Sequence, residues 1–265
     1  MGEYPRRQIL VEPPRVIAPD QRIKYGAIAA TVRMAEVAFA DLYAEAAKYA
    51  EVAAIENRDQ LEARMRCLNL AWSIVDQADL LRQLITSEGR AIQLKEAHDF
   101  LSEAEKVREV RNWMRHLPQR VAAYLKRKEA LPPALGALSF TVLKRVRPGL
   151  QISGTINDAD VIEYQTFVLP SAAFERGAKL EGVPEPYTVF KCPVDHFYLQ
   201  AFGYHLNLER IVQAMTAFCD SLAEGVVHFL EGKIAELKVT GEYHPDLEKI
   251  ALEHGWLYTM VAKRD

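Results

Sequence analysis

The hydrophobic repeat of this chain changes at Pro132-Pro133, and that change limits the folds open to it. Upstream, apolar residues such as Ile28, Leu42 and Tyr49 recur with the 3.6-residue period of a helix. Downstream, residues 138–146 begin a region in which apolar and polar residues alternate with the two-residue period of a strand. The sequence therefore predicts an α+β fold, a mainly α-helical bundle with an inserted small antiparallel β-sheet.

The two periods also predict where the elements lie. Helices are expected over residues 25–56, 60–85, 90–116 and 119–129, with a break near Pro118 because proline disfavours helical geometry at the residue before it. Strands are expected over residues 138–146, 150–156, 161–169, 187–191 and 196–205, and a long helix over 208–237. The predicted parts are an extended Pro-rich arm (1–22), a helical bundle (23–131), a sheet insertion (132–206), and a long helix with a short helix and strand (207–265).

Composition narrows the class of protein. Hydrophobic residues make up 49% of the chain, which allows a sizeable core and excludes the disordered and fibrous classes. No apolar run approaches the roughly 18 residues that span a bilayer, so no membrane insertion is expected. Cys67, Cys192 and Cys219 are odd in number and far apart, as suits a reducing cytoplasm. Metal-binding and nucleotide-binding motifs are absent, so neither a metal nor a cofactor is expected.

Charge is distributed unevenly along the chain. Residues 106–147 contain eleven Lys or Arg and two acids, a net charge of +9, which leaves −12 for the rest. Clustered cations favour a polyanionic partner because they release counterions from phosphates. The segment therefore predicts an RNA-binding face formed by Arg115, Arg120, Lys126, Arg127, Lys128, Arg145 and Arg147. The alternative interpretation is an ordinary solvated helix surface.

Arg111 occupies an unusual position near the centre of the apolar face of the helix predicted over 90–116. A charge there must be paired, bound to an anion or placed at the edge of a cleft, because an isolated buried charge is very costly. Asp79 lies on the apolar face of the preceding helix, but in an antiparallel hairpin it would be roughly 20 Å away. Glu45, on the first predicted helix, should lie closer to Arg111 along the axis of the bundle. It is the expected partner if Arg111 forms an internal salt bridge.

The sequence Arg111-Asn112-Trp113-Met114-Arg115-His116 ends that helix. It resembles the signature of the HEPN superfamily, helical bundles with Arg-x4–6-His and usually a polar residue after the arginine. The resemblance covers the helices only. It implies a metal-independent endoribonuclease acting on single-stranded RNA, in which a dimer brings two copies of the motif into one cleft, with Arg111, Asn112 and His116 as the catalytic residues.

The residue types suit that chemistry. A histidine exchanges protons near neutral pH, which fits His116 for general acid or base work. The planar fork of donors on Arg111 fits the stabilisation of charge on phosphate oxygens, and Asn112 would orient the phosphate or cap the helix. Five residues of ideal helix separate Arg111 and His116 by about 140°. The two side chains can converge only if the helix frays at Leu117 or if two subunits each supply one side of the site. A homodimer is the arrangement expected here.

Two alternatives to a ribonuclease stay open. One is a non-catalytic helical protein that binds nucleic acid through the same basic face, and the other is a structural or interaction protein with Arg111 in a salt bridge. A second constellation, Cys192 and His196 with Asp195, resembles a nucleophile and base in content but flanks a predicted turn. His196 and His205 are expected on opposite faces of one strand, which argues against shared metal ligation.

Overall fold

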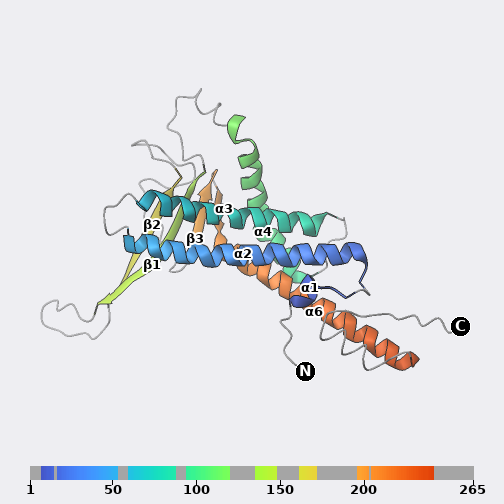
Figure 1. The fold of residues 1–265 in the computed structure, drawn as a ribbon. Helices are drawn as coiled ribbons and strands as arrows, with labels where there is room; N and C mark the ends of the chain where they lie inside the picture. The colour runs from blue at the N-terminus through green and yellow to red at the C-terminus, as the bar shows by residue number, and fades with distance from the viewer. Residues whose placement is uncertain are drawn as a thin grey trace. The chain divides into compact units, whose positions relative to one another are not determined.

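The computed structural model describes residues 7–14, 17–52, 59–87, 94–119, 135–147, 161–171, 196–202 and 204–241. Its helices are α1 (Gln8–Val11), α2 (Pro19–Val52), α3 (Asp59–Thr86), α4 (Lys95–Arg115) and α6 (Leu208–Thr240). Its strands are β1 (Ala137–Arg147), β2 (Val161–Pro170), β3 (Phe197–Ala201) and β4 (Tyr204–Asn207). Long helices and one small antiparallel sheet confirm the predicted α+β fold (Figure 1).

The N-terminal region differs from the extended arm expected over residues 1–22. Gln8–Val11 forms a helical turn, and α2 already begins at Pro19. Proline suits the first position of a helix because its missing N–H has no helical partner there, and Asp20 in the first turn favours the helix dipole. The strands predicted over 150–156 and 187–191, all but the first residue of the helix over 119–129, and the C-terminal short helix and strand lie outside the described residues.

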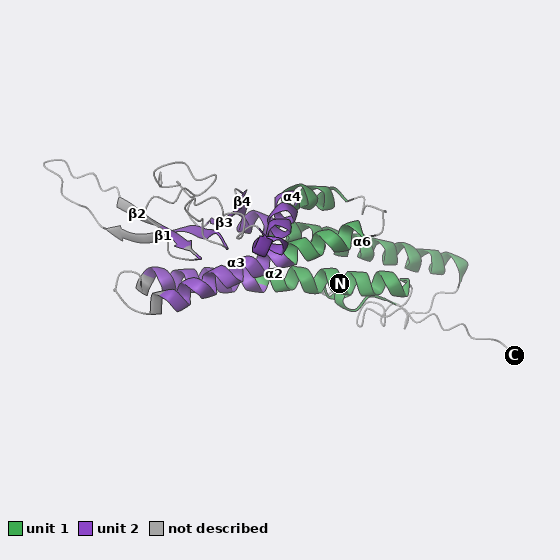
Figure 2. Cartoon of the chain, turned by 90° about the horizontal axis from the view of Figure 1, so that it is seen from above, with its two compact units in different colours: residues 1–36, 77–104, 212–265 green, residues 37–76, 105–211 purple. Residues whose placement is uncertain are grey.

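The described chain forms two compact units (Figure 2). Unit 1 comprises residues 1–36, 77–104 and 212–265, and unit 2 comprises residues 37–76 and 105–211. Helices α2, α3, α4 and α6 each contribute residues to both units. No helix in the part of the chain that the structure describes is long and apolar enough to cross a membrane.

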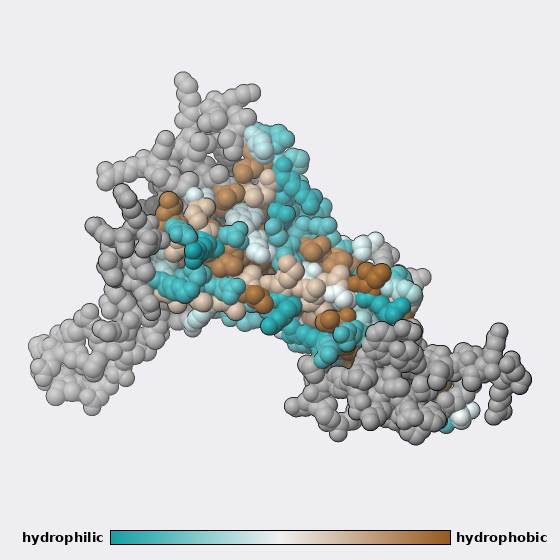
Figure 3. All heavy atoms as spheres, viewed as in Figure 1, coloured by the Kyte–Doolittle hydropathy of each residue, from teal (hydrophilic) through white to brown (hydrophobic). Residues whose placement is uncertain are grey.

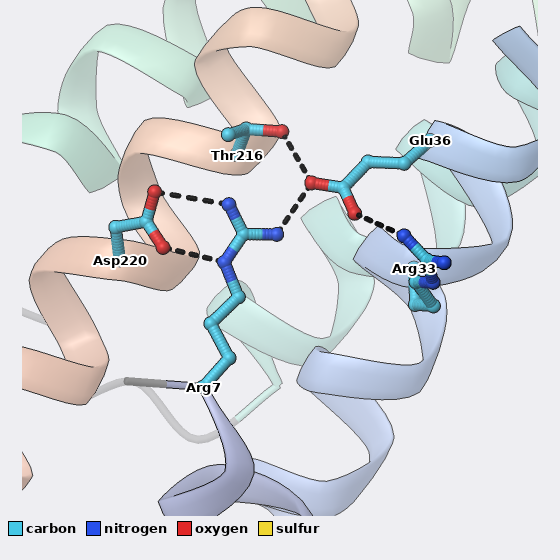
Figure 4. A network of polar contacts seen from close by, with 5 residues as sticks. All are labelled: Arg7, Arg33, Glu36, Thr216 and Asp220. Carbon is cyan, nitrogen blue, oxygen red and sulfur yellow. Dashed lines mark hydrogen bonds and ion pairs between the residues drawn. The ribbon is translucent and has the colours of Figure 1, made fainter. Parts of the chain in front are cut away.

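Unit 1 holds its N-terminal segment with a polar network around Arg7 (Figure 4). The Arg7 guanidinium donates from Nε and Nη2 to Asp220 on α6, the latter at 2.9 Å, and from Nη1 to Glu36 on α2. Thr216 on α6 donates to the same carboxylate of Glu36 at 2.9 Å. Because Leu10 is fully buried, the segment is fixed both by packing and by these charge-assisted hydrogen bonds.

The network shifts the pKa of Arg7 and that of Glu36 in opposite directions. The hydrogen bond to Asp220 raises the pKa of Arg7 beyond its already high value. Burial alone would raise the pKa of Glu36, but hydrogen bonds from Arg7 and Thr216 outweigh it, so the pKa of Glu36 lies below its ordinary value of 4.5. A carboxylate with a lowered pKa in the folded state stabilises that state above its unfolded pKa, and the contribution disappears as the pH falls through the folded pKa.

The sheet of unit 2 has the strand order β2-β1-β3-β4, with every neighbouring pair antiparallel. β2 pairs along the whole of β1 from Ala137↔Pro170 to Arg147↔Val161, with a bulge between Leu143 and Arg145. β3 pairs only with the first four residues of β1, Ala137–Phe140. The predicted first and third strands, over 138–146 and 161–169, are therefore direct partners.

A row of phenylalanines joins three strands to α2. Phe140 on β1 is in register with Phe167 on β2 and with Phe197 on β3. The Phe140 ring stacks on both, at centroid distances of 5.3 and 5.4 Å. Three α2 residues, Phe39, Tyr43 and Tyr49, meet the outer two rings edge-on. Aromatic pairs in this geometry add to the stabilisation from area burial, so this row fixes the sheet on α2.

The segment predicted as one strand over 196–205 is a hairpin instead. Ala201 pairs with Tyr204 across the two-residue connection Phe202-Gly203, so β3 and β4 lie side by side. His205 is in register with Gln200, and His196 precedes β3, which places the two histidines in different segments and not on opposite faces of one strand. The glycine at 203 was the available turn signal, because glycine inside a strand pattern favours a reversal or bulge.

β1 begins at a glycine that no other residue can replace without disturbance. Gly136 has φ +75°, and a Cβ there would lie 2.1 Å from the carbonyl oxygen of Gln200. Both the left-handed backbone and the close approach of β3 therefore require the absence of a side chain.

Replacing Gly136 by Ala should destabilise the protein by about 2–4 kcal/mol, because the new methyl overlaps a backbone oxygen and the backbone is strained. The midpoint and the slope of the urea unfolding transition together give the free energy of unfolding, which measures this loss. Gly225→Ala on α6, where nothing lies within 4 Å, is the control and should stabilise by about 0.5–1 kcal/mol. Equal midpoints for the two variants would refute the close approach of β3 to β1.

Replacing Arg7 by Ala should lower stability by about 1–2 kcal/mol at pH 7, and the loss should shrink as the pH falls through the lowered pKa of Glu36. Denaturation of the parent and the variant at pH 7 and at successively lower pH values measures the difference. Arg33→Ala is the control, since Arg33 lies 3.6 Å from Glu36 with 75% of its side chain exposed, and it should have little effect. A loss from Arg7→Ala that does not depend on pH would contradict the charge-assisted network.

Candidate functional site

The end of α4 places Arg111 against α3. Arg111 Nη1 lies 2.9 Å from Oδ1 of Asp76, and the two side chains are 27% and 47% exposed. Nε of Arg111 is buried and has no hydrogen-bond partner within the described part of the chain. Val107 and Val110 are fully buried on the same helix, which holds the arginine at the margin of the core. Of the three arrangements expected for Arg111, the structure shows the ion pair, with a partly exposed guanidinium.

The prediction that Glu45 would be the acidic partner of Arg111 is wrong. Glu45 pairs with Lys48 at 2.6 Å, and Asp76 takes its place beside Arg111. Asp79 accepts hydrogen bonds from Arg82 and Gln83. The estimate of levels assumed that α3 and α4 run alongside each other, whereas α4 runs across α3 (Figure 1).

The remaining residues of the motif lie on the solvent side of the helix end. Asn112 and Arg115 are exposed, and His116 is exposed in the turn that follows Arg115. The N–H of His116 donates to the carbonyl of Trp113 at 3.2 Å, which continues the chain direction past the helix end. Figure 3 shows mainly hydrophilic residues along the outer side of α4. One helix end thus presents an amide, a guanidinium and an imidazole to solvent beside the anchored Arg111.

An aromatic cluster supports this helix end from the other side. Trp113 stacks on Phe202, at a centroid distance of 5.8 Å and an angle of 10°. Phe202 also lies near Trp72 on α3, at a ring-centroid distance of 6.4 Å. Nε1 of Trp72 donates to the carbonyl of Leu135. Phe202 has φ 54°, which is unfavourable for a residue with a Cβ. The stacking therefore holds a strained turn residue in place and connects the β3–β4 hairpin to the residue next to Asn112.

No contact of Trp72 or Trp113 with Phe202 was predicted, because Phe202 was expected inside the strand over residues 196–205. Its position before glycine is the one signal that could have placed it at a turn.

The predicted RNA-binding residues are only partly located. Arg115 belongs to the exposed helix end, whereas Arg120, Lys126, Arg127 and Lys128 lie outside the described residues. Arg145 and Arg147 lie in the part of β1 beyond the bulge, which pairs with β2. Arg145 is in register with Glu163. The structure therefore brings Arg111, Asn112, Arg115 and His116 to one helix end, and it leaves the rest of the basic face as a prediction.

Of the second constellation, only His196 lies in the described part of the chain. Cys192 and Asp195 lie outside it, and His196 places Nδ1 2.6 Å from Glu209 in the first turn of α6. Cys67 and Cys219 are buried, and burial raises the pKa of both thiols to about 11, which disfavours the reactive thiolate. No group of three or more His, Cys, Asp or Glu able to hold a metal occurs among the described residues.

Comparison with known proteins adds no family to this picture: no family model, curated protein or solved structure matches the chain. The interpretation of the helix end therefore depends on the residues themselves.

Replacing Phe202 by Gly should destabilise less than replacing it by Ala, by about 1 kcal/mol, although glycine removes more of the side chain. Both variants lose the stack with Trp113, but only alanine keeps the unfavourable left-handed backbone. Urea denaturation followed by tryptophan fluorescence measures the two midpoints. If alanine were the better tolerated residue, the turn would not require positive φ.

Proposed function

We propose that the end of α4 is the active site of a metal-independent endoribonuclease that acts on single-stranded RNA. The observation that carries the proposal is the arrangement of one helix end, where Arg111, paired with Asp76, is followed along the chain by the exposed side chains of Asn112, Arg115 and His116. The resemblance of Arg111–His116 to the HEPN signature supports it. The proposal also draws on the net charge of +9 over residues 106–147.

In this proposal the RNA supplies its own nucleophile. The 2′-hydroxyl attacks the adjacent phosphorus, the bond from phosphorus to the 5′-oxygen breaks, and a 2′,3′-cyclic phosphate forms. The imidazole of His116 from one chain takes the proton from the 2′-hydroxyl. A second imidazole returns a proton to the leaving 5′-oxygen. Arg111 stabilises the charge that builds up on the phosphate oxygens, and Asn112 orients the phosphate.

The second imidazole comes from a second copy of the chain. Arg111 and His116 are about 140° apart around an ideal helix, so one helix end presents them to different sides. A homodimer that joins two helix ends would form a cleft between them. Each chain would then supply one Arg111 and one His116 to the bound phosphate. A dimer of one parent chain and one His116→Ala chain would hold a single imidazole at the shared site, so it should cut RNA far more slowly than the parent dimer.

Purified protein should cut a labelled single-stranded RNA in EDTA and leave a 2′,3′-cyclic phosphate. His116→Ala should reduce the rate by about 10²- to 10⁴-fold and keep RNA affinity, because it removes proton transfer. Arg111→Ala should reduce both the rate and the affinity, because it deletes a phosphate contact. Rates and filter-binding affinities are measured on the same preparations.

Two residues of the same helix provide matched controls. His98 and Arg108 are exposed on α4 outside the motif, so His98→Ala and Arg108→Ala should cut RNA at nearly the parental rate. If His116→Ala and His98→Ala cut equally well, the observed activity does not belong to this site.

A structural role for Arg111 is the second candidate, and its ion pair with Asp76 favours it. On this view the pair only satisfies a charge at the margin of the core, and the helix end needs no ligand. Arg111→Ala would then lower the unfolding midpoint, while RNA would neither bind nor be cut by the parent protein.

A further inference from the structure

We infer that Asp76 sets the affinity of the anion site at Arg111 by occupying the edge of the guanidinium that a phosphate must use. The inference rests on the proposed function, because it takes an RNA phosphate as the anion. It assigns a role to a residue of α3 that lies outside the motif.

The geometry limits which donors an anion can reach. Nε of Arg111 is buried and has no partner in the described part of the chain, so it does not face a ligand arriving from solvent. The two Nη groups are the donors left, and Nη1 is already 2.9 Å from Oδ1 of Asp76. A phosphate that approaches this guanidinium must therefore share it with the carboxylate or displace it.

The exchange is physically accessible because the carboxylate is not deeply buried. Asp76 is 47% exposed, so water can hydrate its carboxylate when a phosphate takes its place beside Arg111. A phosphate carries at least the same charge and also forms charge-assisted hydrogen bonds with a guanidinium. Its like-charge repulsion with Asp76 reduces the gain, so the carboxylate weakens anion binding without preventing it.

This competition favours chains of phosphates over single ones. A free phosphate gains only the contact at Arg111, most of which it loses to Asp76. A polynucleotide adds contacts to other exposed cations of the helix end, such as Arg115. The ligand class that fits the site is therefore an oligonucleotide, with inorganic phosphate as a poor competitor.

Asp76→Asn tests the inference, because the amide keeps the size and the accepting oxygen of the side chain while removing its charge. A ten-nucleotide 2′-O-methyl RNA, which lacks the attacking hydroxyl, and inorganic phosphate are titrated at low salt. The variant should bind the RNA about three- to tenfold more tightly than the parent, and should gain at least as much for inorganic phosphate.

Matched variants separate this effect from net charge. Asp99→Asn removes one negative charge from an exposed position of α4, 12 residues before Arg111, and should change the affinity less than twofold. In an Arg111→Ala background, Asp76→Asn should give no gain, since the effect acts through the guanidinium. Thermal unfolding of all variants confirms that they are folded.

The inference is overturned if Asp76→Asn binds RNA no better than the parent, binds it worse, gains no more than Asp99→Asn, or keeps its gain without Arg111. Absence of binding by both parent and variant overturns it as well. Cleavage of unmodified RNA is a separate readout. Tighter binding without cleavage by any variant would contradict the ribonuclease proposal alone, and cleavage without tighter binding would contradict the role of Asp76 alone.

Discussion

Stacking of Phe140 on Phe167 and Phe197 is the interaction on which unit 2 depends. It ties β1, β2 and β3 together in one register and gives α2 an aromatic surface to pack on. Gly136 permits β3 to approach β1 closely enough for that register. The β3–β4 hairpin is positioned as a consequence, and its turn residue Phe202 reaches Trp113 next to Asn112. The candidate site therefore depends on the sheet even though its polar residues lie on α3, on α4 and in the turn that follows α4.

Arg111 is the polar counterpart of this arrangement. A charge at the margin of a core must have a partner, and Asp76 supplies one while leaving both side chains partly exposed. In the proposed function, this pair would meet the RNA phosphate together with the exposed Asn112, Arg115 and His116.

Much of the fold was predictable, because a hydrophobic period is a local property of the sequence. The long helices around residues 60–85 and 208–237 and the antiparallel strands over 138–146 and 161–169 follow from it. The start of α2 at Pro19 was missed because proline was read as a breaker, although it also begins helices. Asp76 was missed because its choice depends on how α4 crosses α3, which no single helix pattern contains. Phe202 was missed because positive φ at a non-glycine residue has no reliable signal in one sequence.

The most direct test of a functional Arg111 is to observe its guanidinium while RNA binds. Arginine Nε–Hε resonances can be followed by NMR as 2′-O-methyl RNA is added, with Arg111 assigned by the Arg111→Lys variant and Arg108 as an internal reference. An anion site at the helix end predicts a saturable shift of the Arg111 resonance and a much smaller shift at Arg108. An Arg111 resonance that stays fixed at saturating RNA would show that Asp76 alone is its partner and that the arginine is structural.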